Sequence, residues 1–209
     1  MPTRHRGRPA GLSGQAPVLS QEQVKRVLRL IRGQERDGSR AEAAFCLSLY
    51  LGLRAKEIAA LKWGDVYDDN NGLRDVLQLK AAYTKGAKTR TSYIVAPKLR
   101  QVLTEYNKLH RDCRNPNGPL LRSQRGGNMT ASSMVRLLKQ LYMSAGIPEA
   151  SSHTGRRTFI TNLAERGVDL KAIATLAGHS DIKTTALYVD ASPQKLSRIL
   201  AEISFTDGK

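Results

Sequence analysis

Residues 39–58, SRAEAAFCLSLYLGLRAKEI, contain the longest apolar stretch of the chain. Ser39 and Glu42 have the spacing of a capping box, which predicts that a helix begins there. Gly52 can end this helix, because glycine readily takes the left-handed conformation that follows many helices. The apolar run is well short of the roughly 20 residues that span a membrane. The sequence therefore predicts a buried core helix that stops just before Arg54.

Apolar residues recur at helical intervals along most of the remaining chain. Ser20 and Gln23 form another capping box, so a helix is expected to begin after Ser20. Residues 76–79 and 90–95 instead have the pattern of short strands, joined by a hairpin whose tip is residues 85–88. Further helices are expected near residues 54–61, 97–109, 130–146, 154–166, 169–177, 181–189 and 192–203.

These elements predict an α+β fold that is mainly helical, with a small antiparallel sheet in its first half. Residues 1–19 are rich in arginine, proline and glycine, a composition that cannot bury a core. They are expected to form a flexible basic arm. Residues 20–209 are expected to form one domain that ends with the helix at 192–203.

Charge narrows the class of partner. The chain has 34 Lys and Arg against 18 Asp and Glu, a formal net charge of +16. Such an excess requires a polyanion or a membrane surface, and nucleic acid is the leading partner. Only 5% of the residues are aromatic, which leaves few platforms for unpaired bases and favours double-stranded DNA. Residues proposed to contact it from the arm and from the basic block at 80–125 are Arg4, Arg6, Arg8, Lys88 and Arg90.

Other classes of protein are disfavoured by what the sequence lacks. Cys46 and Cys113 are the two cysteines, and they provide neither a disulfide framework nor metal-ligand spacing. No metal or other cofactor is expected. The basic N-terminal stretch is not followed by the apolar segment of an export signal. We expect a cytoplasmic protein with no membrane partner.

Taken singly, the residues that could carry chemistry are ambiguous. His153 and Arg156 are three residues apart, so they would share one helix face and could reach a single anion. Most such pairs are simply exposed on the protein surface and have no function. His179 is expected at the start of a helix that Ser180 caps, and a tyrosine such as Tyr188 is more often a core residue.

The order of the motifs is more informative than any one of them. The chain has GLRAKEI at 52–58, the lysine hairpin at 85, HTGR at 153–156, LAGHS at 176–180 and LYV at 187–189. Together they resemble the tyrosine recombinases, or phage integrase family, over roughly residues 20–205. The resemblance implies the catalytic-domain fold of that family and DNA cleavage without a metal. In that reaction a tyrosine attacks the scissile phosphodiester, forms a 3′-phosphotyrosine and releases a 5′-hydroxyl, and a different 5′-hydroxyl is then joined.

The resemblance implies roles for individual residues. Tyr188 matches the nucleophile. Arg54 and Arg156 match the two arginines that clamp the non-bridging oxygens, and a guanidinium can donate two parallel hydrogen bonds to a phosphate. Lys85 matches the general acid for the leaving 5′-oxygen, with Lys88 as the alternative if the hairpin register is shifted.

Further positions have supporting roles by the same resemblance. His153 matches the residue that assists proton transfer at the tyrosine. His179 matches a His or Trp position that hydrogen-bonds the phosphate or packs beside the nucleophile. Glu57 matches a structural acidic residue, and Arg157 is assigned to a backbone phosphate because it points about 100° away from Arg156 on a helix.

The sequence departs from the family pattern at two places. Gly155 stands where relatives commonly carry a bulky apolar residue. Only 53 residues precede Arg54, too few for the separate core-binding domain of typical integrases. The chain is expected to be either a short recombinase, similar in size to the inverting recombinases of fimbrial switches, or an isolated catalytic domain.

Alternatives concern assembly and activity. The family acts as a tetramer on two DNA duplexes, so we expect a homotetramer there and a monomer or dimer when free. The helix at 192–203 could dock on a neighbouring subunit or on its own domain. Two other functions stay open: a non-catalytic helix-turn-helix regulator, and a nicking-closing enzyme similar to type IB topoisomerases.

Overall fold

The computed structural model describes residues 16–33, 38–83, 89–124 and 126–187. Several predictions fall outside these residues: the arm with Arg4, Arg6 and Arg8, the hairpin lysines Lys85 and Lys88, Tyr188, and the helix at 192–203. Within the described ranges, no helix is long and apolar enough to cross a membrane.

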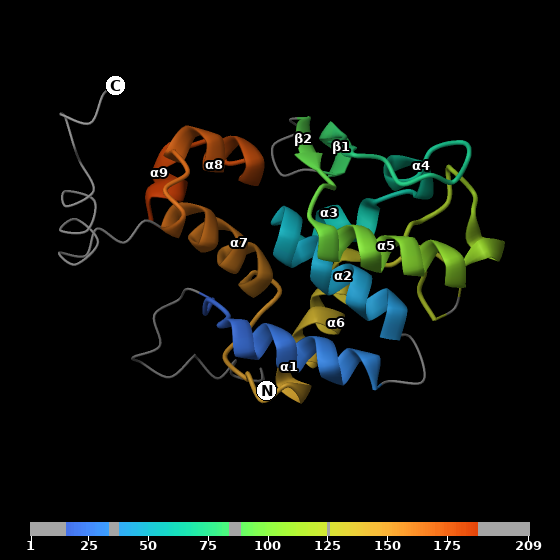
Figure 1. The fold of residues 1–209 in the computed structure, drawn as a ribbon, viewed down its shortest axis with the longest axis horizontal. Helices are drawn as coiled ribbons and strands as arrows, with labels where there is room; N and C mark the ends of the chain where they lie inside the picture. Colours follow the sequence, from blue (N-terminus) through green and yellow to red (C-terminus); the bar gives the residue numbers. More distant parts are fainter. Residues whose placement is uncertain (1–15, 34–37, 84–88, 125, 188–209) are drawn as a thin grey trace, which may run out of the picture.

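Helix α2 (Gly38–Leu51) is the centre of the fold, with α1, α5, α6 and α7 packed around it (Figure 1). Phe45, Cys46 and Leu47 are completely buried, which is the pattern of a helix that is apolar on all sides. The predicted core helix is therefore confirmed. Its predicted capping box is wrong, because the helix already includes Ser39, whose hydroxyl lies 3.0 Å from His110 Nε2.

Helix α1 (Gln21–Arg32) crosses below α2 in Figure 1. The capping box predicted at Ser20 and Gln23 is present in both directions. The inner face of the helix buries Val27 and Ile31. Just before the helix, the backbone N–H of Leu19 donates to Thr158 Oγ1 at 2.9 Å, which ties the start of the domain to α7.

The sheet consists of β1 (Val76–Leu79) and β2 (Arg90–Tyr93), which pair antiparallel with Leu79 opposite Arg90. Its position in the first half of the chain agrees with the prediction. The neighbouring elements in the chain are α3 (Ala55–Ala60), α4 (Trp63–Val66), the 3-10 turn at Ala81–Tyr83 and α5 (Pro97–Leu109), and a second 3-10 turn at Arg111–Cys113 follows α5. Helix α4 was not predicted, since four residues are too short to show a helical period.

The last described elements are α6 (Ala131–Ser144), α7 (Thr154–Glu165), α8 (Leu170–Ala177) and α9 (Ile182–Ala186). Apolar residues of α7 and α8 form a small second core of their own: Ile160, Ala164, Ile173 and Ala177. In Figure 1, α8 lies above α7, on the side where the β1–β2 hairpin stands.

One local prediction near the site is wrong. Asp181, and not Ser180, caps α9, through its side chain to the N–H of Lys183. His179 consequently follows the end of α8, which Gly178 closes in the left-handed conformation at φ 65°. The histidine lies in the short connection between two helices, and the end of α8 decides where its ring is placed.

Candidate active site

A glycine turn brings the first arginine to the site. Gly52 ends α2 at φ 61°, and a Cβ there would lie 2.5 Å from Phe159 Cδ1. Only glycine combines this backbone conformation with such close contact to α7. The carbonyl of Gly52 accepts a hydrogen bond from Arg156 Nη1 at 2.7 Å. The end of the core helix is thereby joined to the second arginine of the site.

Arg54 is held by the buried carboxylate of Glu57. Its backbone N–H donates to Glu57 Oε2 at 2.8 Å, and its Nη1 donates to Oε1 at 2.9 Å. Nη2 reaches the carbonyl of Gly178 at 3.3 Å. The side chain of Arg54 is 22% exposed whereas that of Glu57 is completely buried. The site therefore presents the positive charge of Arg54 to solvent, and the carboxylate of Glu57 is buried behind it.

Glu57 stays ionised despite its burial. Desolvation raises the pKa of its carboxyl, but the guanidinium of Arg90 and the N–H and guanidinium of Arg54 outweigh it and hold the pKa below its usual value. Arg90 Nη2 donates to Oε2 at 2.8 Å. One carboxylate therefore orients two arginines from different places in the chain, Arg54 just before α3 and Arg90 on β2.

Arg156 lies deeper, on α7, and is only 5% exposed. Besides Gly52, it donates to the carbonyl of Ala177 through Nη2 at 2.6 Å. Gly155, the residue before Arg156, stands where relatives commonly carry a bulky apolar residue. The structure explains this departure, because even a Cβ on Gly155 would lie 2.6 Å from Ser48 Oγ. Gly155 lets α7 approach α2 closely enough for Arg156 to reach the end of α2.

The two histidines lie near the arginines and are predominantly neutral at pH 7. Desolvation, then the charges of Arg156 and Arg54, lower the pKa of His153, which immediately precedes α7. Burial, then Arg156, Arg54 and Arg90, lower the pKa of His179 to about 4. His179 Nδ1 is 2.8 Å from the buried hydroxyl of Thr185, which fixes its ring.

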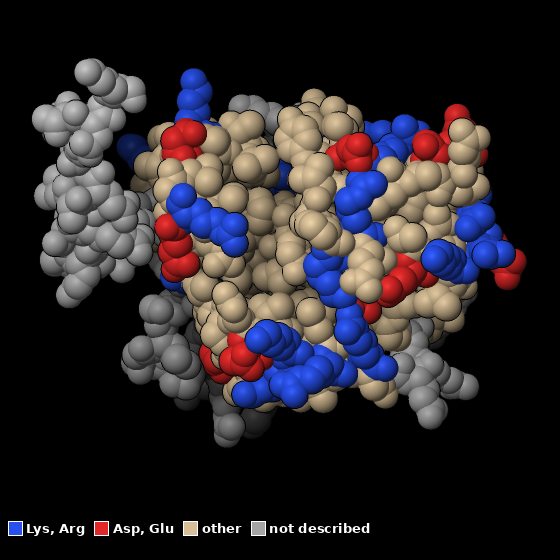
Figure 2. All heavy atoms as spheres, viewed as in Figure 1, with Lys and Arg blue, Asp and Glu red and all other residues tan. Residues whose placement is uncertain are grey.

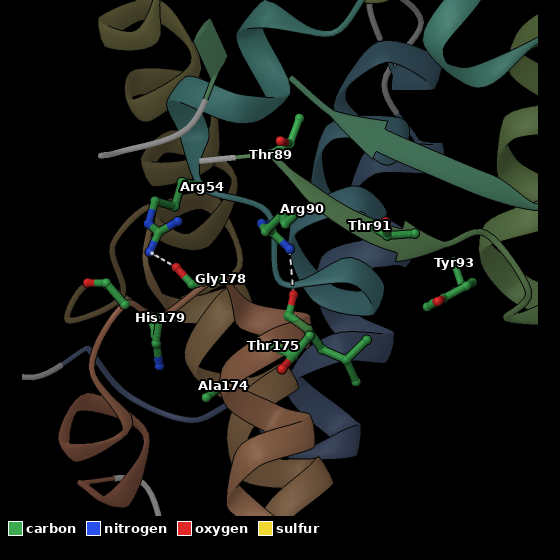
Figure 3. A pocket seen from close by; sticks show the side chains of 11 residues that line it. Arg54, Thr89, Arg90, Thr91, Tyr93, Ala174, Thr175, Gly178 and His179 are labelled. Atoms are coloured by element: carbon green, nitrogen blue, oxygen red, sulfur yellow. Dashed lines mark hydrogen bonds between the residues drawn. The ribbon is translucent and has the colours of Figure 1, made fainter. Parts of the chain in front are cut away.

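Arg54, Arg90, Gly178 and His179 border an open groove with a volume of about 520 Å³. Arg156 is buried behind this groove and is bonded to the end of α8. Figure 3 shows Arg54, Thr89 and Arg90 on one side and Gly178 and His179 on the other, with Arg54 and Arg90 each bonded across to the end of α8. A wall with arginines and no exposed carboxylate suits an anion such as a phosphate. No cluster able to hold a metal ion is found among the described residues.

The structure brings together four of the six predicted catalytic residues, Arg54, His153, Arg156 and His179, from distant points of the sequence. Lys85 and Tyr188 lie outside the described residues. Arg157, predicted to contact DNA, is half-buried on α7.

The prediction for Arg90 is wrong. This residue was predicted to contact DNA, but its side chain is 7% exposed and is bonded to Glu57 and to the carbonyl of Leu176. Sequence reasoning missed this inward orientation. The alternation of β2 carried a signal, because Arg90 shares the buried face with Ser92.

Comparison with known proteins identifies the family. The family model of the phage integrase family matches residues 17–195. The chain belongs to this family. Among curated integrase-family relatives, the XerC-like tyrosine recombinase of Caldanaerobacter subterraneus is 28% identical over 205 residues, covering 85% of this chain and 51% of the relative. Tyrosine recombinase XerD of Rickettsia bellii is 31% identical over 192 residues, covering 88% and 62%. The chain spans little more than half the length of these relatives.

Solved structures of recombinases have the same fold. XerA recombinase has a TM-score of 0.70 at 24% identity, covering 90% of this chain and 66% of that one. XerH site-specific recombinase, bound to its palindromic difH substrate, has a TM-score of 0.69 at 21% identity, covering 91% and 54%. The predicted α+β, mainly helical fold class is confirmed.

Proposed function

We propose that this chain is the catalytic domain of a site-specific DNA recombinase that cleaves and rejoins strands through a 3′-phosphotyrosine on Tyr188. The products would be integration, excision or inversion of DNA. The observation that carries the proposal is the convergence of four of the matched residues. Arg54 and His179 line one groove, Arg156 is buried behind it, and His153 is close enough to both arginines for their charges to lower its pKa, while the acid, Glu57, is buried.

The arginines would bind the scissile phosphate and stabilise its transition state. Arg54 is the more exposed of the two, so its fork would donate to the non-bridging oxygens. Arg156 adds a second positive charge behind it. Charge on these oxygens increases as the fifth bond to phosphorus forms, and preorganised donors are then worth more than in the ground state.

Proton transfers complete the proposed reaction. The Tyr188 oxygen attacks phosphorus and loses its proton to His153, whose lowered pKa leaves the ring able to accept it. The bond from phosphorus to the 5′-oxygen breaks, and Lys85, or Lys88 in a shifted register, protonates that oxygen. Rejoining reverses these transfers with a 5′-hydroxyl as the attacking group. His179, anchored by Thr185, would support the phosphate or the tyrosine.

Duplex DNA is the proposed partner. Figure 2 shows Lys and Arg side chains gathered along the lower edge of the face it displays, over α1. Those of α1 are all exposed: Lys25, Arg26, Arg29 and Arg32. Together with the arm and Lys88 they would contact backbone phosphates, as would Arg157. On two DNA sites we propose a homotetramer, with the helix at 192–203 as a candidate contact between subunits.

A nicked duplex tests the reaction. The DNA site is first selected from random duplexes and footprinted, and a nick is then placed near the scissile phosphate. The nick lets the short fragment that carries the released 5′-hydroxyl diffuse away, so a covalent adduct that resists SDS is expected, and Tyr188→Phe is expected to abolish it. Specific binding without an adduct would indicate the regulator. An adduct with DNA relaxation but no exchange between two sites would indicate the topoisomerase-like enzyme.

A further inference from the structure

Three arginines bind three successive carbonyls at the end of α8. The carbonyl of Leu176 accepts from Arg90 Nη1, that of Ala177 from Arg156 Nη2 at 2.6 Å, and that of Gly178 from Arg54 Nη2 at 3.3 Å. The last carbonyls of a helix have no partner within the helix and carry partial negative charge. The end of α8 therefore supplies hydrogen-bond acceptors to the three arginines.

Arg90 has a different place in this arrangement from the other two arginines. Its side chain is buried, and its two terminal nitrogens bind different elements: Nη2 binds Glu57 of α3 and Nη1 binds the end of α8. Glu57 in turn holds Arg54 by two hydrogen bonds. A continuous chain of contacts thus runs from the α8 carbonyls through Arg90 and Glu57 to Arg54.

The stem of Arg90 also contacts the backbone beside His179. A Cβ added to Gly178 would overlap Arg90 Cδ. Since Gly178 takes the left-handed conformation immediately before His179, this contact sets where the histidine leaves the helix. Removing the Arg90 side chain would empty the space beneath Gly178 and free the carbonyl of Leu176.

We propose that Arg90 is a positioning residue that aligns both walls of the phosphate site, Arg54 through Glu57 and His179 through the end of α8. The proposal rests on the proposed recombinase function. Arg90 does not itself touch the phosphate. Its role is to hold Arg54 and His179 in their reactive positions before DNA binds. Less conformational entropy is then lost when the transition state forms.

Arg90→Met, Arg90→Lys and the control Arg74→Met test this with the nicked duplex. Arg74 is an exposed arginine that also donates to two carbonyls, those of Gly64 and Tyr67. Arg90→Met is expected to slow adduct formation by about 100-fold, the scale of a small misplacement of catalytic groups, at unchanged DNA affinity. Arg90→Lys keeps the charge but cannot reach both partners, so it is expected to be slow as well. Arg74→Met should react at the wild-type rate.

A double-mutant cycle separates positioning from general damage. If Arg90 acts through Arg54, Arg90→Met is expected to slow an Arg54→Lys enzyme much less than it slows the wild type. Amide hydrogen exchange without DNA gives a second measurement, and faster exchange is expected at Gly178 and His179 in both Arg90 variants. This measurement applies even to a variant too slow to assay.

The outcomes for the two proposals are distinct. A wild-type protein that forms no adduct overturns the proposed function, while faster exchange at Gly178 and His179 would still support the alignment of the groove by Arg90. A wild-type protein that reacts, together with Arg90 variants that react and exchange as fast as it does, overturns the positioning role. Equal losses from Arg90→Met in the wild-type and Arg54→Lys backgrounds would also overturn it.

Discussion

The core around α2 and the groove between β2 and α8 are held together by different interactions. Helix α2 is surrounded by apolar side chains, and its position follows from burying them. The groove instead depends on Arg54, Arg90 and Arg156, each of which donates to a carbonyl at the end of α8. Apolar packing tolerates changes that preserve volume. A network of directional hydrogen bonds fails when one member is removed.

Arg156 joins the two regions, so its loss is expected to have the largest effect. Arg156→Met would leave the carbonyls of Gly52 and Ala177 without their donor and remove the positive charge that is buried behind the groove. We expect adduct formation to slow by about 100- to 1,000-fold. The free energy of unfolding should fall by about 1–3 kcal/mol.

Single-turnover cleavage of the nicked duplex and urea denaturation measure these two effects. Arg74→Met, which removes an exposed arginine with two carbonyl partners, is the control and should change neither quantity appreciably. An Arg156→Met protein that keeps the wild-type cleavage rate would show that the two regions do not depend on this contact.

A substitution in the core that leaves the polar groups of the groove in place is expected to have the next largest effect. Gly155→Leu would force a side chain against Ser48, since even a Cβ lies 2.6 Å from its Oγ. Overpacking of this kind costs about 1–3 kcal/mol. Thermal and urea unfolding measure it, with Gly127→Ala as the control, because a Cβ at Gly127 meets nothing within 4 Å. Unchanged stability would mean that α2 and α7 separate at little cost.

The smallest expected effect is a dependence of stability on pH. The unfolded His179 has a pKa of about 6.5, and in the folded protein burial and then the charges of Arg156, Arg54 and Arg90 lower its pKa to about 4. Between these values the unfolded state binds the extra proton. Stability contributed by neutral His179 is therefore present above pH 6.5 and is lost as the pH falls toward 4.

His179 alone should contribute a slope of at most about 1.4 kcal/mol per pH unit. Urea unfolding between pH 7 and 5 measures this slope, and His179→Gln should reduce it. His153 contributes in the same direction and accounts for part of what remains. The carboxyl of Glu57, whose pKa lies below its usual value, contributes only at lower pH. Equal slopes for the wild type and His179→Gln would contradict the groove's electrostatics.

Local signals predicted secondary structure well where a long apolar period was present. The capping box at Ser20 was found as predicted, whereas Ser39, which has the same spacing to Glu42, lies inside α2 and does not cap it. The difference is tertiary: Ser39 bonds to His110, and Glu42 pairs with Arg32 of α1 at 3.1 Å. A motif four residues long cannot show which partner its side chains will find.

For the site, too, the local motifs could be predicted from the sequence and the tertiary contacts could not. The motif order placed Arg54, His153, Arg156 and His179 in one site, and the structure brings them together. The inward orientation of Arg90 escaped prediction because it depends on α8 lying across β2. Lys85 and Tyr188 remain predictions from the sequence.

The sequence by itself determined the fold class, the buried central helix and the residue types suited to phosphate chemistry, because these follow from local periodicity and from the order of motifs. Only the tertiary structure decided which atoms hold the arginines. The carbonyls of residues 176–178 carry no side-chain signature, and every residue has one. They become partners of Arg54, Arg90 and Arg156 because the end of α8 packs against β2 and reaches Arg54, although Gly178 and Arg54 are 124 residues apart in the chain.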